Sequence, residues 1–84
     1  MLTIALSVYD SKADCFSPPF FSRSRGEGLR NFADAGRDQQ SSLSRHPEDF
    51  SLYQIGVFND SDGRFASQEP ERLSSLSELL IKPE

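Results

Sequence analysis

The residues best suited to catalytic or metal chemistry in this chain are its one cysteine, Cys15, and its one histidine, His46. A lone cysteine cannot form an internal disulfide, and these two side chains cannot hold zinc without further ligands. His46 and Asp49 have the types of an acid–base pair, but no nucleophile, orienting group or glycine-rich phosphate loop accompanies them. We therefore predict no catalytic residue, no metal site and no cofactor. The alternative, a small enzyme or metal-dependent module, requires a pocket that joins Cys15, His46 and a carboxylate.

The acidic segment from Asp60 to Gly63 has part of the pattern of a calcium loop. When Asp60, Asp62 and Gly63 take positions three, five and six of such a loop, Glu69 falls at position twelve. Position one requires a carboxylate, and here it is Phe58. Because Asn, Asp and Gly also tolerate the positive φ angles of tight turns, we predict a hairpin turn rather than a calcium site.

A stronger candidate site is the segment "FSPPFFSRSR" at 16–25, which combines aromatic and basic residues. Proteins that bind single-stranded nucleic acids stack bases on aromatic rings and track phosphates with cations. An equally physical interpretation is that the phenylalanines cover a sheet while the arginines solvate a loop, in a chain of net charge −4. The residues of the nucleic-acid hypothesis are Phe20, Phe21, Arg23, Arg25 and Arg30.

The charge distribution supports a competing hypothesis of protein docking. Residues 21–46 carry five arginines against three acids, whereas residues 47–84 carry eight acids against three bases. The acidic excess disfavours broad, tight DNA binding and favours contact with a protein. The apolar loop or the leucines of the last segment would supply apolar contacts. The polar residues of this partner-docking hypothesis are His46, Glu48, Asp49, Asp60 and Asp62.

Two segments, 2–9 and 51–58, show the alternation expected of strands. The second has apolar residues on both faces and precedes the turn at 59–63, which predicts a central strand and an antiparallel hairpin over 51–66. One face of the sheet is expected to bury Leu2, Ile4, Leu6, Val8, Tyr53, Ile55 and Val57.

Helical spacing appears in two other segments. Apolar residues at i, i+3, i+4 and i+7 predict a helix over 27–36 that covers the sheet, namely Leu29, Phe32, Ala33 and Gly36. A C-terminal helix after Pro70 is predicted by Leu73, Leu76 and Leu80. The fold class is therefore α+β, a small single domain in the order strand, helix, strand, strand, with a C-terminal helix.

The length of 84 residues suits one small domain with a modest core. We predict a small α+β domain over residues 1–66 and a C-terminal extension over 67–84 that is helical or partly disordered. The opening apolar stretch is too short and lacks the basic flank of a secretory signal, and no apolar run approaches the roughly 18 residues of a membrane span. We expect an intracellular protein with no membrane partner.

Three segments together resemble a known family: "YDSKADCFSPPFF" at 9–21, "LRNFADA" at 29–35 and "HPEDFSLYQIGVFNDSDGRF" at 46–65. They resemble the small nonstructural protein of gokushovirus-type microviruses, single-stranded DNA phages, grouped as the phage open-reading-frame-five family. The resemblance covers residues 1–66. It implies a protein of the host cell cytoplasm that is absent from the virion. It also implies a role in phage DNA replication, in the switch from duplex replicative form to single-stranded genomes.

Two mechanisms are open for such a non-enzymatic accessory protein. It binds single-stranded DNA through the aromatic and basic segment, or it docks onto a phage or host replication protein without contacting DNA. A homodimer is a further hypothesis, because the small core and an exposed edge of the first strand would favour pairing of two protomers.

Overall fold

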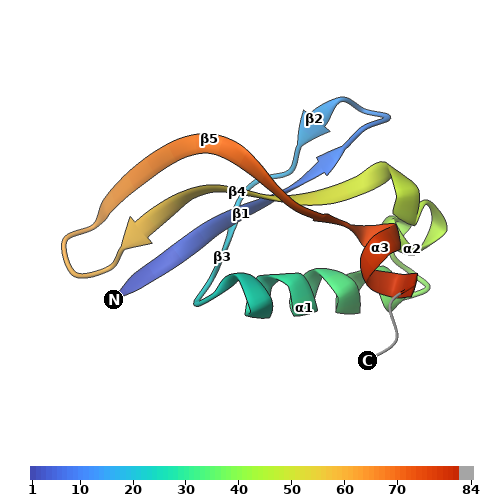
Figure 1. The fold of residues 1–84 in the computed structure, drawn as a ribbon, viewed down its shortest axis with the longest axis horizontal. Coiled ribbons are helices and arrows are strands. Elements are labelled where there is room, and N and C mark those ends of the chain that lie inside the picture. Colours follow the sequence, from blue (N-terminus) through green and yellow to red (C-terminus); the bar gives the residue numbers. More distant parts are fainter. Residues whose placement is uncertain (82–84) are drawn as a thin grey trace.

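The computed structural model describes residues 1–81 and shows one antiparallel sheet with helices along one side (Figure 1). The chain runs through β1 (Leu2–Asp10), β2 (Cys15–Phe16), β3 (Phe20–Ser22), α1 (Arg25–Arg37), α2 (Ser42–Arg45) and a short 3-10 helix, η1 (Pro47–Asp49). Then follow β4 (Phe50–Asn59), β5 (Arg64–Ser75) and α3 (Leu76–Ile81). The combination of an antiparallel sheet with helices is the predicted α+β class.

Strand β4 lies in the middle of the sheet, whose order is β2-β1-β4-β5, with β3 also paired to β1. The predicted antiparallel hairpin is present, because β4 pairs with β5 from Asn59 and Arg64 onward. Gly63, at φ 74°, donates its amide hydrogen to the Asn59 carbonyl at 2.8 Å and closes the turn. Strand β1 is not an edge strand, since it has β4 on one side and β2 and β3 on the other, and the dimer hypothesis that starts from an open edge of this strand stays a hypothesis. The outer strand next to β4 is β5.

A β-bulge interrupts the pairing of β1 with β4. Ala5 lies opposite Gly56, but the next residue of β1, Leu6, lies opposite Gln54. Ile55 is therefore the extra residue of the bulge, and the alternation of side chains along β4 changes phase there.

Because of the bulge, the residues that share the buried face differ from those predicted. Residues directly opposite each other share a face of the sheet. Leu52 therefore lies on the same side as Val8, toward α1, whereas Tyr53 lies opposite Ser7 on the other side. The prediction that Tyr53, Ile55 and Val57 form one face is wrong, because a strict period of two cannot account for an extra residue.

The core lies between the helix side of the sheet and the helices. Its buried residues come from β1, α1, β4 and α3, namely Leu6, Phe32, Leu52 and Leu76. Helix α1 packs closely because Gly28 lies against the sheet, where a Cβ atom would come within 2.2 Å of Leu6 Cδ1. Leu2, predicted to be buried, is 61% exposed, because β1 begins beyond the end of α1 (Figure 1).

The C-terminal part differs from the prediction in its secondary structure. Strand β5 continues to Ser75, so Leu73 belongs to the sheet and the helix begins only at Leu76. Leu76 is fully buried in the core that β1, α1 and β4 also form. Residues 82–84 of the predicted extension lie outside the described residues.

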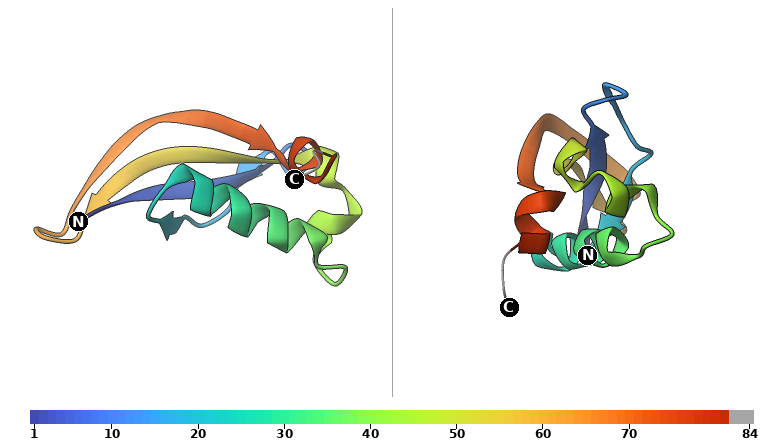
Figure 2. Two further views of the ribbon diagram at one scale, coloured as in Figure 1. Left: turned by 60° about the horizontal axis from the view of Figure 1, so that its bottom comes forward. Right: turned by 90° about the vertical axis from the view of Figure 1, so that its right-hand side faces the viewer.

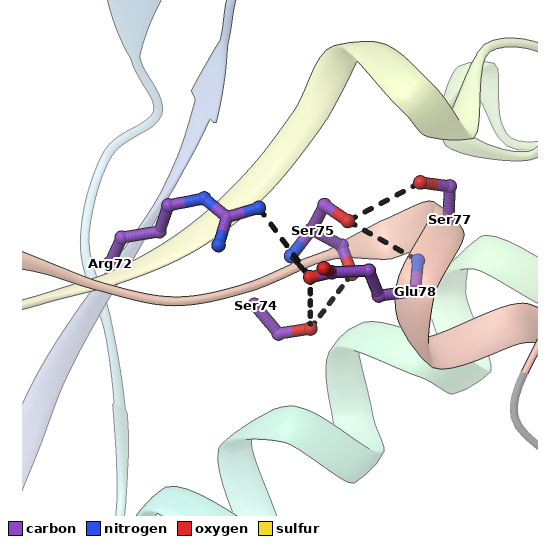
Figure 3. A network of polar contacts seen from close by, with 5 residues as sticks. All are labelled: Arg72, Ser74, Ser75, Ser77 and Glu78. Carbon is purple, nitrogen blue, oxygen red and sulfur yellow. Dashed lines mark hydrogen bonds and ion pairs between the residues drawn. The ribbon is translucent and has the colours of Figure 1, made fainter.

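A reciprocal hydrogen-bond pair starts α3 (Figure 3). The Glu78 amide donates to Ser75 Oγ at 3.2 Å, and the Ser75 amide donates to Glu78 Oε1 at 3.2 Å. This is a capping box, which satisfies two of the free amide donors at the helix start. Arg72 Nη2 lies 3.5 Å from the same carboxylate oxygen.

Candidate nucleic-acid interface

The sheet face turned away from α1 carries no helix within residues 1–81 (Figures 1 and 2). We call it the open face. The pairing registers place on it the side chains of Thr3, Ala5, Ser7, Tyr9, Phe16, Phe21, Ser51, Tyr53, Gly56, Phe58, Phe65, Ser67, Arg72 and Ser75. Six of the nine aromatic residues of the chain are therefore on this face. The other three, Phe20, Phe32 and Phe50, belong to the core or pack against it.

The tyrosine cluster of the open face consists of Tyr9, Phe16 and Tyr53. Its ring centroids are separated by 4.9 Å between Tyr9 and Phe16, 5.9 Å between the two tyrosines, and 5.3 Å between Phe16 and Tyr53. The Tyr9 hydroxyl donates a hydrogen bond to Asp14 Oδ1. This bond is the main cause that raises the pKa of Tyr9 above its ordinary value of 10.0, so the ring stays neutral near pH 7.

The phenylalanine cluster of the open face consists of Phe21, Phe58 and Phe65. The ring centroids of Phe21 and Phe58 are 5.8 Å apart, and Phe65 lies opposite Phe58 in the hairpin. Phe21 is 52% exposed and Phe65 is 48% exposed. A hollow of about 400 Å³ opens at this cluster, lined by Thr3, Phe21, Phe58 and Asp60. Large rings that stay half exposed offer stacking surface to a ligand.

Small residues form the floor between the two clusters. Ala5 and Ser7 on β1 are fully buried, and Gly56 lies beside Ala5 on β4. A Cβ atom on Gly56 would come within 2.5 Å of the Phe65 ring and within 2.7 Å of the Ala66 carbonyl oxygen. Only glycine therefore allows the Phe65 ring to lie over β4. The clusters are separated by about four residues of β1, which is roughly 13 Å of strand.

The two adjacent phenylalanines of the predicted site lie on opposite faces of the sheet. Phe21 pairs with Ala5 on the open face. Phe20 pairs with Leu6 and packs against the core, so it offers no stacking surface to a ligand on the open face. The strand period separates them, because successive side chains of β3 point to opposite sides.

The three arginines of the predicted site do not converge on the aromatic rings. Arg25, at the start of α1, donates from Nε to Gln54 Oε1 at 2.8 Å and from Nη2 to Glu71 Oε1 at 2.7 Å, on the helix side of the sheet. Arg30 is exposed on α1, and Arg23 is exposed in the connection before that helix. The structure therefore brings only Phe21 of the predicted set onto the open face.

The predicted docking residues lie in two groups at opposite ends of β4 (Figure 1). His46, Glu48 and Asp49 stand at its start, with their potential ligand atoms within 4.8 Å of one another. Asp60 and Asp62 lie in the turn at its end, where Asp60 pairs with the Met1 ammonium at 2.7 Å. These five residues do not form one surface.

Cys15 and His46 line two neighbouring pockets. One pocket includes Cys15, Leu43 and Phe50, and the other includes His46, Glu48 and Phe50. The two pockets share Asp10 and Phe50, but Cys15 lines one of them and His46 the other.

Sequence reasoning included Phe16 in the aromatic and basic segment at 16–25 but missed four aromatic residues of the open face, namely Tyr9, Tyr53, Phe58 and Phe65. A signal was present for one of them, Tyr9. In the alternating pattern of the first strand, Leu6 and Val8 share one face and Tyr9 lies on the other. An aromatic residue on the solvent-exposed face of a strand is a sign of binding. No comparable signal marks Phe58 or Phe65, because their face depends on the bulge in β4.

Comparison with models of protein families found a match to the family described as Phage ORF5 protein over residues 3–79. No curated protein and no solved structure matches the chain. Among the described residues, no helix is long and apolar enough to cross a membrane.

Proposed function

This chain belongs to the phage ORF5 protein family, and from that premise we propose that it is a non-enzymatic phage protein that binds single-stranded DNA during viral genome replication. The observation that carries the proposal is the open face with its two aromatic clusters. Stacking of a base on an aromatic side chain contributes about 1–3 kcal/mol to binding.

The geometry favours unpaired bases over duplex DNA. In a duplex each base is already stacked and paired, so an aromatic ring on a sheet cannot reach its flat surface. Phe16, Phe21 and Phe65 are each 44–52% exposed and present their rings at the surface of the sheet. Only a strand with splayed bases can use such rings, which fits the single-stranded stage of replication.

The biological setting of the proposal comes from the family resemblance. In this setting the protein acts in the host cell cytoplasm and is absent from the virion. It helps the switch from duplex replicative form to single-stranded genomes. A protein that coats the newly displaced strand would keep it from being copied back into duplex. The open face supports the binding step of this role.

Docking on a phage or host replication protein is the second candidate. The acidic residues at both ends of β4 favour it, because Glu48, Asp49 and Asp62 would repel the phosphates of a strand that ran past them. Exposed aromatic rings also suit protein contacts. In that case the open face would bind a protein, and DNA would not bind at any salt concentration.

A titration that follows tyrosine emission tests the proposal. The chain has no Trp and two Tyr, and both belong to the tyrosine cluster, so its near-ultraviolet emission reports the open face. We expect an unlabelled single-stranded oligonucleotide to quench this emission at low salt, after correction for its absorbance, and a duplex of equal length to leave it unchanged. Anisotropy of a labelled strand should give the same affinity.

Matched variants locate the binding surface. Phe21→Ala should weaken binding about tenfold, the loss of one stacked base. Arg30→Ala is the control, because Arg30 is exposed on α1, on the other side of the sheet, and its removal should change the affinity little. Absence of binding of the native protein at low salt would refute the DNA hypothesis in favour of protein docking.

A further inference from the structure

We infer that the open face recognises single strands by base stacking almost alone, so that binding tolerates any base sequence and depends only weakly on salt. This inference rests on the proposed function and specifies its ligand class. It follows from the polar groups and charges that the open face contains.

The hydroxyl groups of the open face are poorly suited to reading bases. Ser7 is fully buried and donates to the Ser17 carbonyl at 2.7 Å, and the Tyr9 hydroxyl donates to Asp14. Ser75 is 8% exposed and caps α3. The hydroxyls of Thr3, Ser51 and Ser67 both donate and accept, so they cannot discriminate between donor and acceptor patterns of bases.

Few cations accompany the aromatic rings. Arg72 lies opposite Tyr53 on β5, and Lys12 is exposed in the turn between β1 and β2. Arg72 is already 3.5 Å from the Glu78 carboxylate, and Asp14 and Asp60 lie beside the two clusters. A face with these charges can neutralise about two phosphates, which predicts a salt slope of about −1.4 for a single strand.

Three labelled strands of about 12 nucleotides test the inference: oligo-dT, oligo-dC and an abasic strand with the same number of phosphates. We expect dissociation constants of oligo-dT and oligo-dC to agree within about threefold, because both bases present a flat ring surface. The abasic strand should bind at least about tenfold more weakly, since it keeps the charge and loses stacking. A plot of log affinity against log salt should have a slope near −1.4.

The outcomes separate this inference from the function on which it rests. A preference of about tenfold or more for one base would show specific readout and overturn the inference, with single-strand binding intact. Equal binding of the abasic strand, or a slope steeper than about −4, would show that phosphate contacts dominate and would also overturn it. No binding of any strand at low salt would refute both the inference and the proposed function.

Arg72→Ala provides a second measurement that does not depend on core packing, because the Arg72 side chain is 49% exposed. Loss of one phosphate contact should make the salt slope shallower by about 0.7 and leave the ratio of oligo-dT to abasic affinity high. Arg37, paired with Asp34 at 3.7 Å on α1, supplies the matched control Arg37→Ala, which should leave the slope unchanged. A larger change with Arg37→Ala than with Arg72→Ala would contradict the assignment of the cation to the open face.

Discussion

The two faces of the sheet differ in what covers their large side chains. On the helix side, Leu6 and Leu52 are fully buried beneath α1 and α3. On the open face, Phe16, Phe21 and Phe65 remain 44–52% exposed although they are as apolar as the core residues. Burial of apolar surface contributes about 25 cal/mol per Å², so the exposed rings give up stability that a covered face would gain. The helix side of the sheet therefore stabilises the fold, and the open face is available for a ligand.

Two neighbouring residues of β4, Leu52 and Tyr53, lie on opposite faces of the sheet and test whether the faces differ in function. Leu52→Ala should lower the free energy of unfolding by about 2–5 kcal/mol, because it leaves a cavity in the core. Tyr53→Ala removes a cross-strand aromatic contact on the open face and should cost about 1 kcal/mol or less. Urea unfolding followed by far-ultraviolet circular dichroism measures both.

The binding assay should rank the same two variants in the opposite order. Tyr53→Ala should weaken single-strand binding about tenfold, while the fraction of Leu52→Ala that remains folded should bind normally. If both variants lost equal stability and equal affinity, the distinction between a structural face and a binding face would be wrong.

A substitution at Gly56 tests the close packing at the floor of the open face, and its expected effect on stability is smaller than that of Leu52→Ala. Gly56→Ala should destabilise the protein by about 1–3 kcal/mol, because the new Cβ would press on the Phe65 ring and the Ala66 carbonyl oxygen. Gly26→Ala is the control, since its Cβ would meet nothing closer than Ser24 Oγ at 4.0 Å, and alanine favours a helix. Thermal unfolding of the two variants compares them, and equal melting temperatures would contradict the close contact of Phe65 with Gly56.

Substitution of Glu78, where the open face meets α3, has the smallest expected effect on stability. Hydrogen bonds from the Ser75 amide and hydroxyl, and then the charge of Arg72, hold the pKa of Glu78 below its ordinary value of 4.5. A carboxyl group with a lowered pKa stabilises the fold at pH values above that ordinary value, and this contribution is lost as the pH falls through the lowered pKa. Glu78→Gln keeps a side chain that a capping box accepts but does not titrate, so its melting temperature should fall less on acidification.

The same variant has a predicted effect on binding. Removal of the Glu78 charge takes away a carboxylate that lies 3.5 Å from Arg72 and competes with phosphate for it, so single-strand affinity should rise. Glu71→Gln is the control, because Glu71 pairs with Arg25 on the helix side of the sheet. If Glu78→Gln left the affinity unchanged while Glu71→Gln raised it, the cation that contacts DNA would be Arg25 on the helix side rather than Arg72 on the open face.

Part of this architecture could be predicted from local patterns. The alternation at 2–8 identifies β1, and Asn59 to Gly63 identifies the turn of the hairpin, because turn chemistry is local. The spacing of Leu29 and Phe32 identifies the helix that covers the sheet. The leucine spacing predicts a helix over residues 70–75, but Glu71, Arg72, Ser74 and Ser75 pair with β4, and this tertiary contact overrides the leucine spacing.

The candidate site was less accessible to sequence reasoning than the fold. Local patterns were enough to identify the family, the α+β class and the segment at 16–25 that is rich in aromatic and basic residues. The division of Phe20 into the core and of Phe21 onto the open face, with Tyr53 and Phe58, appears only once the strands are paired. The face of each side chain is set by the bulge at Ile55 and by the pairing of β1 with β2, β3 and β4 and of β4 with β5. Such long-range register is set by contacts between distant segments, which no local pattern contains.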